Sequence, residues 1–258
     1  MKIYLFRHGA VQGSGEKVFL GRTDLPLSGE GRRQAEAWRA HFAGRVPGRI
    51  VSSPLRRALD FARIVAADRA GGVEAFSAFS EIDLGDWDGR PMAEIREHDP
   101  ASWTARGDDF AGFAPPGGES FADLANRVVP AFYLLAAKAE TDLMMVCHAG
   151  VNRVILCSLL GMPLAYIFRL GQDPGCLNVI ERRGQQFRVA AMNCPVFERE
   201  KRRTPNAEHQ TPNTEHQTLN TEHRTPNTKH KTPNTEHQTL NTKHQTLNVK
   251  HRMQQQGC

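Results

Sequence analysis

The sequence predicts an α/β fold with a mostly parallel sheet, and three observations carry this prediction. Two short apolar runs, Ile3–Phe6 and Leu143–Cys147, have the composition of strands buried on both faces of a parallel sheet. Each run leads into a histidine that is soon followed by a glycine, with His8 after the first run and His148 after the second. Amphipathic helical patterns separate the candidate strands, as expected for strand–helix units.

Composition divides the 258 residues into two unlike parts. Residues 1–195 have an ordinary globular composition and a net charge of +1, whereas residues 196–258 carry a net charge of +4. The basic character therefore belongs largely to the end of the chain and does not indicate that the globular part binds nucleic acid. We expect one folded domain over residues 1–195 and a low-complexity tail over residues 196–258.

Cysteine spacing and hydropathy indicate a cytoplasmic protein. The five cysteines are widely spaced and include no CxxC pair, which argues against a disulfide framework or a zinc site. The N-terminal apolar run is too short for a signal peptide, and no apolar stretch reaches the length of about 18 residues that a membrane span needs. We expect a small-molecule ligand and no membrane partner; the sequence does not indicate an oligomeric state.

The first half of the chain carries clear boundary signals. Ser28 is a typical helix N-cap, and a proline such as Pro54 suits the first turn of a helix. The expected elements here are a strand at Ile3–Phe6, a helix from Ser28 to about Ala43, a strand over Arg49–Ser52, a helix beginning at Ser53-Pro54 and a short strand over Val73–Phe76.

The second half repeats the strand–helix alternation and then ends in a hairpin. The expected elements here are a helix from Pro91 to about Trp103, a loop over Phe110–Gly118, a long helix beginning at Glu119–Phe121, a strand over Leu143–Cys147, a helix over Val151–Leu160, and two strands, Cys176–Arg182 and Phe187–Met192, around a turn at Arg183-Gly184.

The two histidines point to one site, because the carboxyl ends of parallel strands meet at the same edge of a sheet. A neutral imidazole can attack phosphorus, and the neighbouring guanidinium of Arg7 matches phosphate oxygens. Arg56 and Arg57 fall in the first turn of a helix, whose backbone N–H groups favour an anion. The structural alternative is a set of solvated side chains that happen to follow strands.

The segment Phe79–Gly89 mixes Glu81 and three aspartates with Trp87 and two glycines. A carboxyl held beside an aromatic ring in a partly dry loop can act as a general acid, because burial favours its protonated form. An acidic surface loop and a calcium loop are the alternatives. The spacing does not fit an EF-hand, which disfavours calcium.

Together these motifs resemble the histidine phosphatase superfamily, the group that includes the cofactor-dependent phosphoglycerate mutases. The resemblance spans residues 1–195 and is carried by four segments: Arg7-His8-Gly9, Ser53-Pro54-Leu55-Arg56-Arg57-Ala58, Glu81 to Gly89, and His148-Ala149-Gly150. It implies a three-layer α/β/α sandwich of the phosphoglycerate mutase type, with a mostly parallel central sheet.

The resemblance also assigns roles. It makes His8 the nucleophile and Glu81 the proton donor, and it makes Arg57, not Arg56, the second phosphate-binding arginine. The implied catalytic residues are His8, Glu81, Arg7, Arg57 and His148, and the implied substrate-binding residues are Arg7, Ser14, Gly21, Arg57, His148 and Ala149. No metal or cofactor is expected, since two guanidinium groups and a protonated His148 would supply the positive charge.

Within the superfamily the chain is similar to the α-ribazole-5′-phosphate phosphatases of cobalamin biosynthesis, which makes α-ribazole 5′-phosphate the expected substrate. Three stretches carry this likeness: Thr23–Ser28, Pro116–Phe121 and Gln172–Cys176. Ala10-Val11 and Ser14 depart from the usual Glu-Thr and Asn of the family, and these departures bear on substrate preference. A broad-specificity or sugar-phosphate phosphatase, a phosphoglycerate mutase and a non-catalytic phosphate-binding protein are the alternatives.

The tail from Thr204 to Arg252 consists of seven consecutive heptads. A coiled coil is excluded, because the single weakly apolar position of each heptad is proline in four of the seven. We expect this tail to be disordered. Its one histidine per heptad is compatible with loose binding of transition metals but not with a fixed metal site. A functionally neutral, expanded repeat is favoured over an interaction module.

Overall fold

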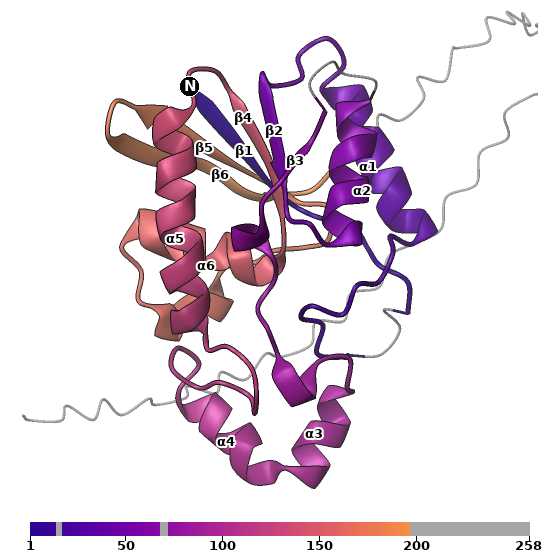
Figure 1. Cartoon of the computed structure of the whole chain (residues 1–258), viewed down its shortest axis with the longest axis vertical. Helices are drawn as coiled ribbons and strands as arrows, with labels where there is room; N and C mark the ends of the chain where they lie inside the picture. Colours follow the sequence, from indigo (N-terminus) through magenta and orange to yellow (C-terminus); the bar gives the residue numbers. More distant parts are fainter. Residues whose placement is uncertain (14–16, 68–71, 197–258) are drawn as a thin grey trace, which may run out of the picture. The chain divides into compact units, whose positions relative to one another are not determined.

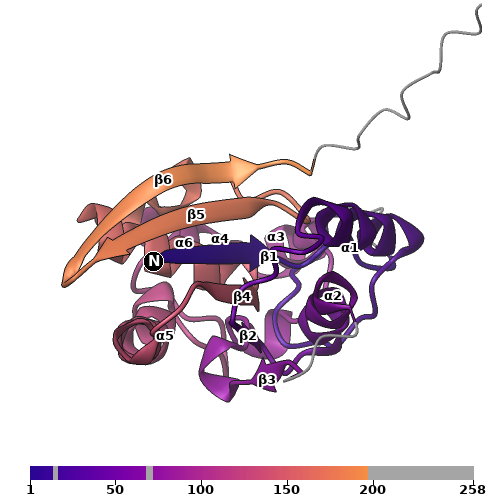
Figure 2. The same cartoon turned by 90° about the horizontal axis from the view of Figure 1, so that it is seen from above.

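The apolar run Leu143–Cys147 forms strand β4, all five residues of which are buried inside a six-stranded sheet. The computed structural model describes residues 1–13, 17–67 and 72–196. Over these residues the strand order is β3-β2-β4-β1-β5-β6 (Figures 1 and 2). The strands are β1 (Lys2–Arg7), β2 (Arg49–Ser52), β3 (Glu74–Ala75), β4 (Leu143–Cys147), β5 (Leu177–Arg183) and β6 (Gln186–Cys194).

Parallel pairing places three strand ends side by side. β4 pairs in parallel with β1 on one side and with β2 on the other, and β2 continues the parallel ladder to β3. The hairpin of β5 and β6 adds two antiparallel strands at the β1 edge. The carboxyl ends of β1, β4 and β2 therefore meet at one edge of the sheet, as predicted.

Helices cover both faces of the sheet and complete the predicted three-layer sandwich (Figure 2). α1 and α2 pack together on one face, and α5 and α6 pack together on the other. α3 and α4 stand beyond the carboxyl ends of the strands (Figure 1). The helices are α1 (Gly29–His41), α2 (Arg56–Ala66), α3 (Met92–His98), α4 (Pro100–Asp108), α5 (Phe121–Lys138) and α6 (Ala149–Leu160), with short 3₁₀ turns at Ser77–Phe79, Gly85–Trp87 and Leu164–Arg169.

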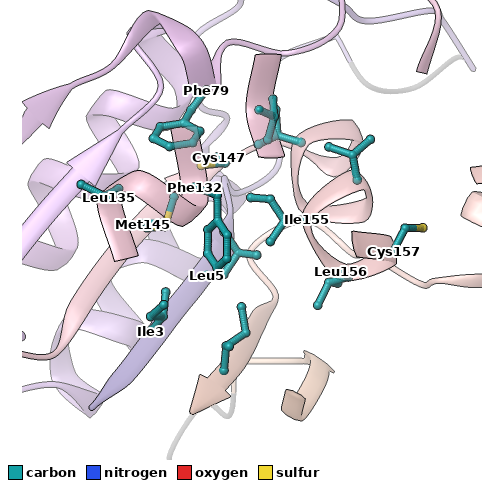
Figure 3. Packing of buried hydrophobic residues seen from close by; sticks show 14 of the residues in the cluster. Ile3, Leu5, Phe79, Phe132, Leu135, Met145, Cys147, Ile155, Leu156 and Cys157 are labelled. Atoms are coloured by element: carbon teal, nitrogen blue, oxygen red, sulfur yellow. The ribbon is translucent and has the colours of Figure 1, made fainter. Parts of the chain in front are cut away.

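Each face of the sheet has its own apolar core. Phe6 and Phe61 pack in the core beneath α1 and α2. Leu5, Met145 and Phe132 meet in the core beneath α5 and α6 (Figure 3). Because Leu5 and Phe6 are consecutive residues of one strand, β1 supplies side chains to both cores, and burial on both faces accounts for its continuous apolar run.

The two helices that flank the site edge are capped in different ways. Ser28 caps α1 as predicted, since its hydroxyl accepts a hydrogen bond from the backbone N–H of Gly31 at 3.1 Å. α2 begins at Arg56, two residues later than Pro54 suggested, and its N-cap residue has no side-chain cap. Instead the carboxylate of Asp24, distant in sequence, accepts the backbone N–H of Arg56 at 2.7 Å.

Other element boundaries also differ from the expected ones. The helix expected from Pro91 to Trp103 is two helices, α3 and α4, because Pro100 cannot continue α3 and Asp99 caps α4. α6 begins at Ala149 rather than Val151. The hairpin turn lies one residue later than expected, after Arg183.

Two sequence predictions lie outside the described residues, namely Ser14 as a substrate-binding residue and the disorder of the heptad tail. Within the part of the chain that the structure describes, none of the helices combines the length and the apolar character needed to cross a membrane.

Replacement of Ser120 tests the cap of α5. Ser120 and Asp123 form a capping box, in which the Ser120 hydroxyl accepts the Asp123 N–H at 3.1 Å and the Asp123 carboxylate accepts the Ser120 N–H at 3.0 Å. We predict that Ser120→Ala lowers the free energy of unfolding by about 1 kcal/mol in urea titrations. Ser102→Ala, inside α4, is the control and is expected to have a smaller effect; equal effects would contradict the capping role.

Candidate active site

The three adjacent strand ends bring His8, His148 and Ser53 together. The rings of His8 and His148 lie with their centroids 5.1 Å apart. His148 Nε2 lies 2.7 Å from the hydroxyl of Ser53, which follows β2. Backbone hydrogen bonds continue past the strand ends, from His8 N–H to the Cys147 carbonyl and from Ser53 N–H to the Val146 carbonyl, both 3.0 Å. The site is therefore rigidly joined to the sheet.

His8 is buried, and its Nε2 carries the lone pair that can attack phosphorus. Its Nδ1 lies 2.7 Å from the Gly9 carbonyl, which can only accept, so Nδ1 carries the proton. Nε2 is then the acceptor, and Arg57 Nε donates to it at 3.2 Å. Burial, followed by the charges of Arg57 and Arg7, holds the pKa of His8 well below its ordinary value of 6.5. A neutral imidazole with this tautomer is the form that acts as a nucleophile.

Arg57 is the buried arginine of the helix start, with only 1% of its surface exposed, whereas the Arg56 side chain is 61% exposed and pairs with Asp60. The Arg57 guanidinium donates to the carbonyls of Gly21 and Thr23, each at 2.6 Å, in addition to His8. Burial lowers its pKa, but an arginine stays charged at neutral pH. The structure thus brings Arg57, not Arg56, to the histidines.

Arg7 adds a second guanidinium beside His8. Its Nη1 donates to the carbonyl of Gln172, and burial lowers its pKa while the nearby Glu81 raises it. Arg7 Nε and His148 Nδ1 are buried and have no hydrogen-bond partner among the described residues. Unpaired polar atoms are costly to bury, so these atoms are suited to bind the oxygens of an anionic ligand.

The protein atoms around His148 favour its neutral form in the absence of a bound anion. Burial comes first among the causes that hold the pKa of His148 well below 6.5, and the neighbouring His8 and the charges of Arg57, Arg7 and Arg127 act in the same direction. The two arginines of the site therefore carry the positive charge, and only a bound anion would favour a proton on His148.

Glu81 is buried next to the start of α6. Its carboxylate accepts the backbone N–H of Ile82 at 2.9 Å and that of Gly150 at 3.0 Å. A Cβ at position 150 would lie 2.5 Å from Glu81 Oε1, so any side chain there would force the carboxylate to move. The glycine after His148 is therefore required for the close approach of the carboxylate to the helix N-terminus.

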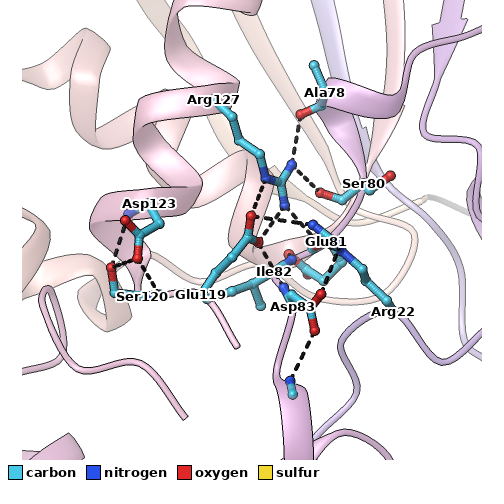
Figure 4. Close-up of polar contacts among 11 residues, drawn as sticks. Arg22, Ala78, Ser80, Glu81, Ile82, Asp83, Glu119, Ser120, Asp123 and Arg127 are labelled. Carbon is cyan, nitrogen blue, oxygen red and sulfur yellow. Dashed lines mark hydrogen bonds and ion pairs between the residues drawn. The ribbon is translucent and has the colours of Figure 1, made fainter. Parts of the chain in front are cut away.

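Arg127 fixes the backbone of the segment that carries Glu81 (Figure 4). Its guanidinium donates to the carbonyls of Ala78, Ser80 and Glu81, all at 2.9 Å. The same group forms a two-pronged ion pair with Glu119 at 2.7 and 2.9 Å. Because a guanidinium is planar and rigid, this pairing holds the acidic segment in one position relative to α5.

Asp88 holds the loop that orients Arg57. Its two carboxylate oxygens accept the backbone N–H groups of Gly21 and Thr23, each at 2.7 Å, and the carbonyls of the same two residues accept from Arg57. The backbone groups of Gly21 are thus engaged within the protein, so Gly21 positions Arg57. Ala149, by contrast, lines the cleft beside His8.

A cleft of about 230 Å³ opens at this edge. The charged residues that line it are Arg7, Arg57, Arg106, Arg153 and Glu81, and the neutral His8 lies beside them. Apolar side chains line the remainder, including Phe19 from the N-terminal loop, Phe121 from α5 and Phe168 from the 3₁₀ turn Leu164–Arg169. The cleft therefore combines a cationic, nucleophile-bearing part with an aromatic part.

The family is shown by the sequence of residues 3–195. The sequence model of the Histidine phosphatase superfamily (branch 1) matches residues 3–195. The chain therefore belongs to the histidine phosphatase superfamily, as the four motifs predicted.

Relatives of two activities resemble the chain. The glucosyl-3-phosphoglycerate phosphatase of Mycolicibacterium vanbaalenii is 36% identical over 172 residues, which cover 63% of this chain and 76% of that protein. The adenosylcobalamin/alpha-ribazole phosphatase of Escherichia coli K12 is 28% identical over 182 residues, covering 70% and 90%. The crystal structure of the alpha-ribazole phosphatase from Shigella flexneri superimposes with a TM-score of 0.71 at 25% identity, covering 78% of this chain and all of that one.

Several site residues were not predicted from the sequence. Arg153 lies four residues after Ala149, so helical spacing places both on one face of α6 and could have revealed it. Asp88 stood in the acidic segment but was not distinguished from its neighbours. Arg106 carries no local signal, because its approach to the cleft depends on the tertiary placement of α4.

Replacement of Asp88 tests the support of Arg57. We predict that Asp88→Ala lowers kcat/KM for p-nitrophenyl phosphate by about a hundredfold, because a small displacement of a positioning group is costly. Asp86→Ala is the matched control, since Asp86 is exposed and no side-chain hydrogen bond holds it in the described structure. Similar rates for the two variants would show that Asp88 does not support Arg57.

The charge state of His8 is open to direct titration. We predict that the His8 imidazole titrates below pH 6.5, so that less than half of it is protonated at that pH and the neutral form persists into mild acid. NMR titration of the free enzyme measures the midpoint, and His8→Ala identifies the resonance. A midpoint above 6.5 would show that burial and the arginines do not govern this group.

Proposed function

We propose that the chain is a metal-independent phosphomonoesterase that acts through a phosphohistidine at His8. The observation that carries the proposal is the Nε2 lone pair of a buried, neutral His8 with the Arg57 guanidinium 3.2 Å away. This pairing sets a nucleophile beside a cation that matches phosphate oxygens. The structure of the mycobacterial glucosyl-3-phosphoglycerate phosphatase in complex with VO3 supports an oxyanion site in this fold, at a TM-score of 0.67 and 30% identity over 75% of this chain and 98% of that one.

In the first step His8 Nε2 attacks phosphorus in line with the bond to the leaving oxygen. The Nδ1–H bond to Gly9 holds the ring in the reactive tautomer. Arg57 Nε, now paired with the attacking nitrogen, is placed to move onto a phosphate oxygen, together with Arg7 and His148. These groups stabilise the charge of the transferring phosphoryl group. Glu81 protonates the leaving alkoxide as the P–O bond breaks.

In the second step water takes the phosphoryl group from His8. Glu81, deprotonated by the first step, accepts a proton from the water as it attacks phosphorus. The N–P bond breaks, and the electron pair returns to His8 Nε2. Because the two arginines already supply the positive charge, the scheme calls for no metal ion.

For the substrate we propose a small phosphate ester, with α-ribazole 5′-phosphate as one of two candidates. The stretches that resemble the α-ribazole-5′-phosphate phosphatases support it, as do the aromatic side chains of the cleft, which suit a planar base. The wide cysteine spacing supports a cytoplasmic location, where cobalamin synthesis would take place. A phosphorylated sugar acid is the second candidate, favoured by the two additional arginines of the cleft, Arg106 and Arg153.

Trapping the intermediate tests the mechanism. We predict that His8→Ala lowers phosphate release from every ester by more than about a thousandfold. His98→Ala is the matched control, because His98 is an exposed histidine of α3. Rapid acid-free quenching followed by ³¹P NMR should detect phosphohistidine in the wild type and in His98→Ala but not in His8→Ala. Substantial turnover by His8→Ala, with no phosphohistidine in the wild type, would refute the mechanism.

A further inference from the structure

Arg106 is a half-buried cation of the cleft for which residues 1–13, 17–67 and 72–196 supply no counter-ion. It projects from α4, and its guanidinium lies over the rings of Phe110, Phe19 and Phe168 at 5.0, 5.3 and 5.5 Å from their centroids. The described residues provide Arg106 with neither an ion pair nor a hydrogen bond. Aromatic faces attract the guanidinium group as a cation, but the N–H donors around the edge of the guanidinium plane remain available for a ligand.

Arg153 lies over the same aromatic ring as Arg106. Its guanidinium is 5.3 Å from the centroid of Phe168, and its Nε donates to the Leu170 carbonyl at 2.9 Å. Burial lowers the pKa of Arg153, and the charge of Arg7 adds to this effect, which places Arg153 within the field of the phosphate-binding arginine. Phe168 is 43% exposed, so the ring between the two guanidinium groups is accessible to a ligand.

The charge of the cleft exceeds what one phosphate group neutralises. Among the described residues, four arginines and one carboxylate line it and His8 is neutral, so this part of the lining carries three net positive charges when Glu81 is ionised. A phosphomonoester brings about two negative charges at neutral pH. One positive charge is left over, and Arg106 and Arg153 are the arginines that the phosphoryl-transfer scheme does not use.

We propose that Arg106, with Arg153 beside it, forms a second anion subsite for the leaving group of the substrate. The preferred substrates are then phosphomonoesters whose alcohol carries a further negative charge, either a carboxylate or a second phosphate. This inference rests on the proposed phosphomonoesterase activity and narrows its substrate class. It ranks a phosphorylated sugar acid above α-ribazole 5′-phosphate, whose leaving alcohol carries no second anion.

Matched pairs of esters test the subsite with the full-length enzyme. In the first pair, glycerol 3-phosphate has a hydroxymethyl group where 3-phosphoglycerate has a carboxylate. In the second pair, fructose 1,6-bisphosphate has one phosphate more than fructose 6-phosphate. We expect wild-type kcat/KM to favour the more charged member of at least one pair by about tenfold, the effect of one charge-assisted hydrogen bond. The pair that shows the preference identifies carboxylate or phosphate as the second anion.

Variants assign that preference to Arg106. Arg106→Gln should reduce the ratio of the two kcat/KM values about tenfold, and Arg106→Lys should retain part of the ratio. Arg96→Gln is the matched control on α3, because Arg96 is exposed and lies outside this cleft. It should leave the ratio unchanged.

Two outcomes would overturn the subsite. One is a wild-type enzyme that hydrolyses both members of each pair equally. The other is an Arg106→Gln variant whose kcat/KM values for the two esters of a pair fall by the same factor while its thermal stability also falls. That result would mean that Arg106 only holds α4 against Phe168. If the wild-type enzyme releases phosphate from none of the esters faster than His8→Ala does, the proposed activity is refuted instead. The subsite is then judged by calorimetric binding of 3-phosphoglycerate against glycerol 3-phosphate, where equal affinities in wild type would refute it.

Discussion

Parallel pairing of β1, β4 and β2 is the constraint on which the site depends. It brings together residues that are far apart in the sequence, because the residue that follows each of these strands lies at the same edge of the sheet. His8, His148 and Ser53 occupy these three positions, and hydrogen bonds from His8 N–H and Ser53 N–H extend the ladder one residue beyond the strands. The histidine separation is thus set by the spacing of the strands and needs no support from the loops.

The supporting groups hold the charged side chains through backbone carbonyls. Arg57 donates to the carbonyls of Gly21 and Thr23, while Asp88 accepts the N–H groups of the same two residues. Arg127 fixes the backbone of Glu81 in a similar manner, with Glu119 as its counter-ion. Asp88 holds the loop and not the guanidinium, so Arg57 is oriented without a direct carboxylate partner among the described residues. Arg127, by contrast, is paired with Glu119, and within the same part of the chain the Glu81 carboxylate is left unpaired by an arginine.

The fold was predictable wherever burial imposes a repeating pattern. The run Leu143–Cys147 and the cap at Ser28 gave a strand and a helix start within a residue of those in the structure. Errors fell where a tertiary contact replaces a local signal. Asp24 caps α2 from a distant loop, so Pro54 alone placed the helix start too early. Pro100 interrupts the surface helix, a local signal that the expected span overlooked.

The same distinction separates the predicted from the unpredicted parts of the site. The motif residues His8 and His148 directly follow strands and Arg57 lies in the first turn of α2, so regular elements bring them together. Charge states were less predictable, because the low pKa of His148 results from burial, from the neighbouring His8 and from arginines contributed by three separate elements, β1, α2 and α5. These contributions to the pKa of His148 come from separate segments, so no single segment of the sequence reveals them.

The divided cleft suggests how one chemistry can serve different substrates within this superfamily. The groups that would act on phosphorus come from the sheet edge and the helix starts beside it. The groups that would contact the leaving alcohol come largely from elsewhere: Phe19 from a loop and Arg106 from α4. Because α4 and that loop do not belong to the sheet, their residues can change without moving His8. We therefore expect substrate preference to be set in the segments where sequence motifs are weakest, and we expect side-chain charge in the cleft to be a better guide to it than overall similarity.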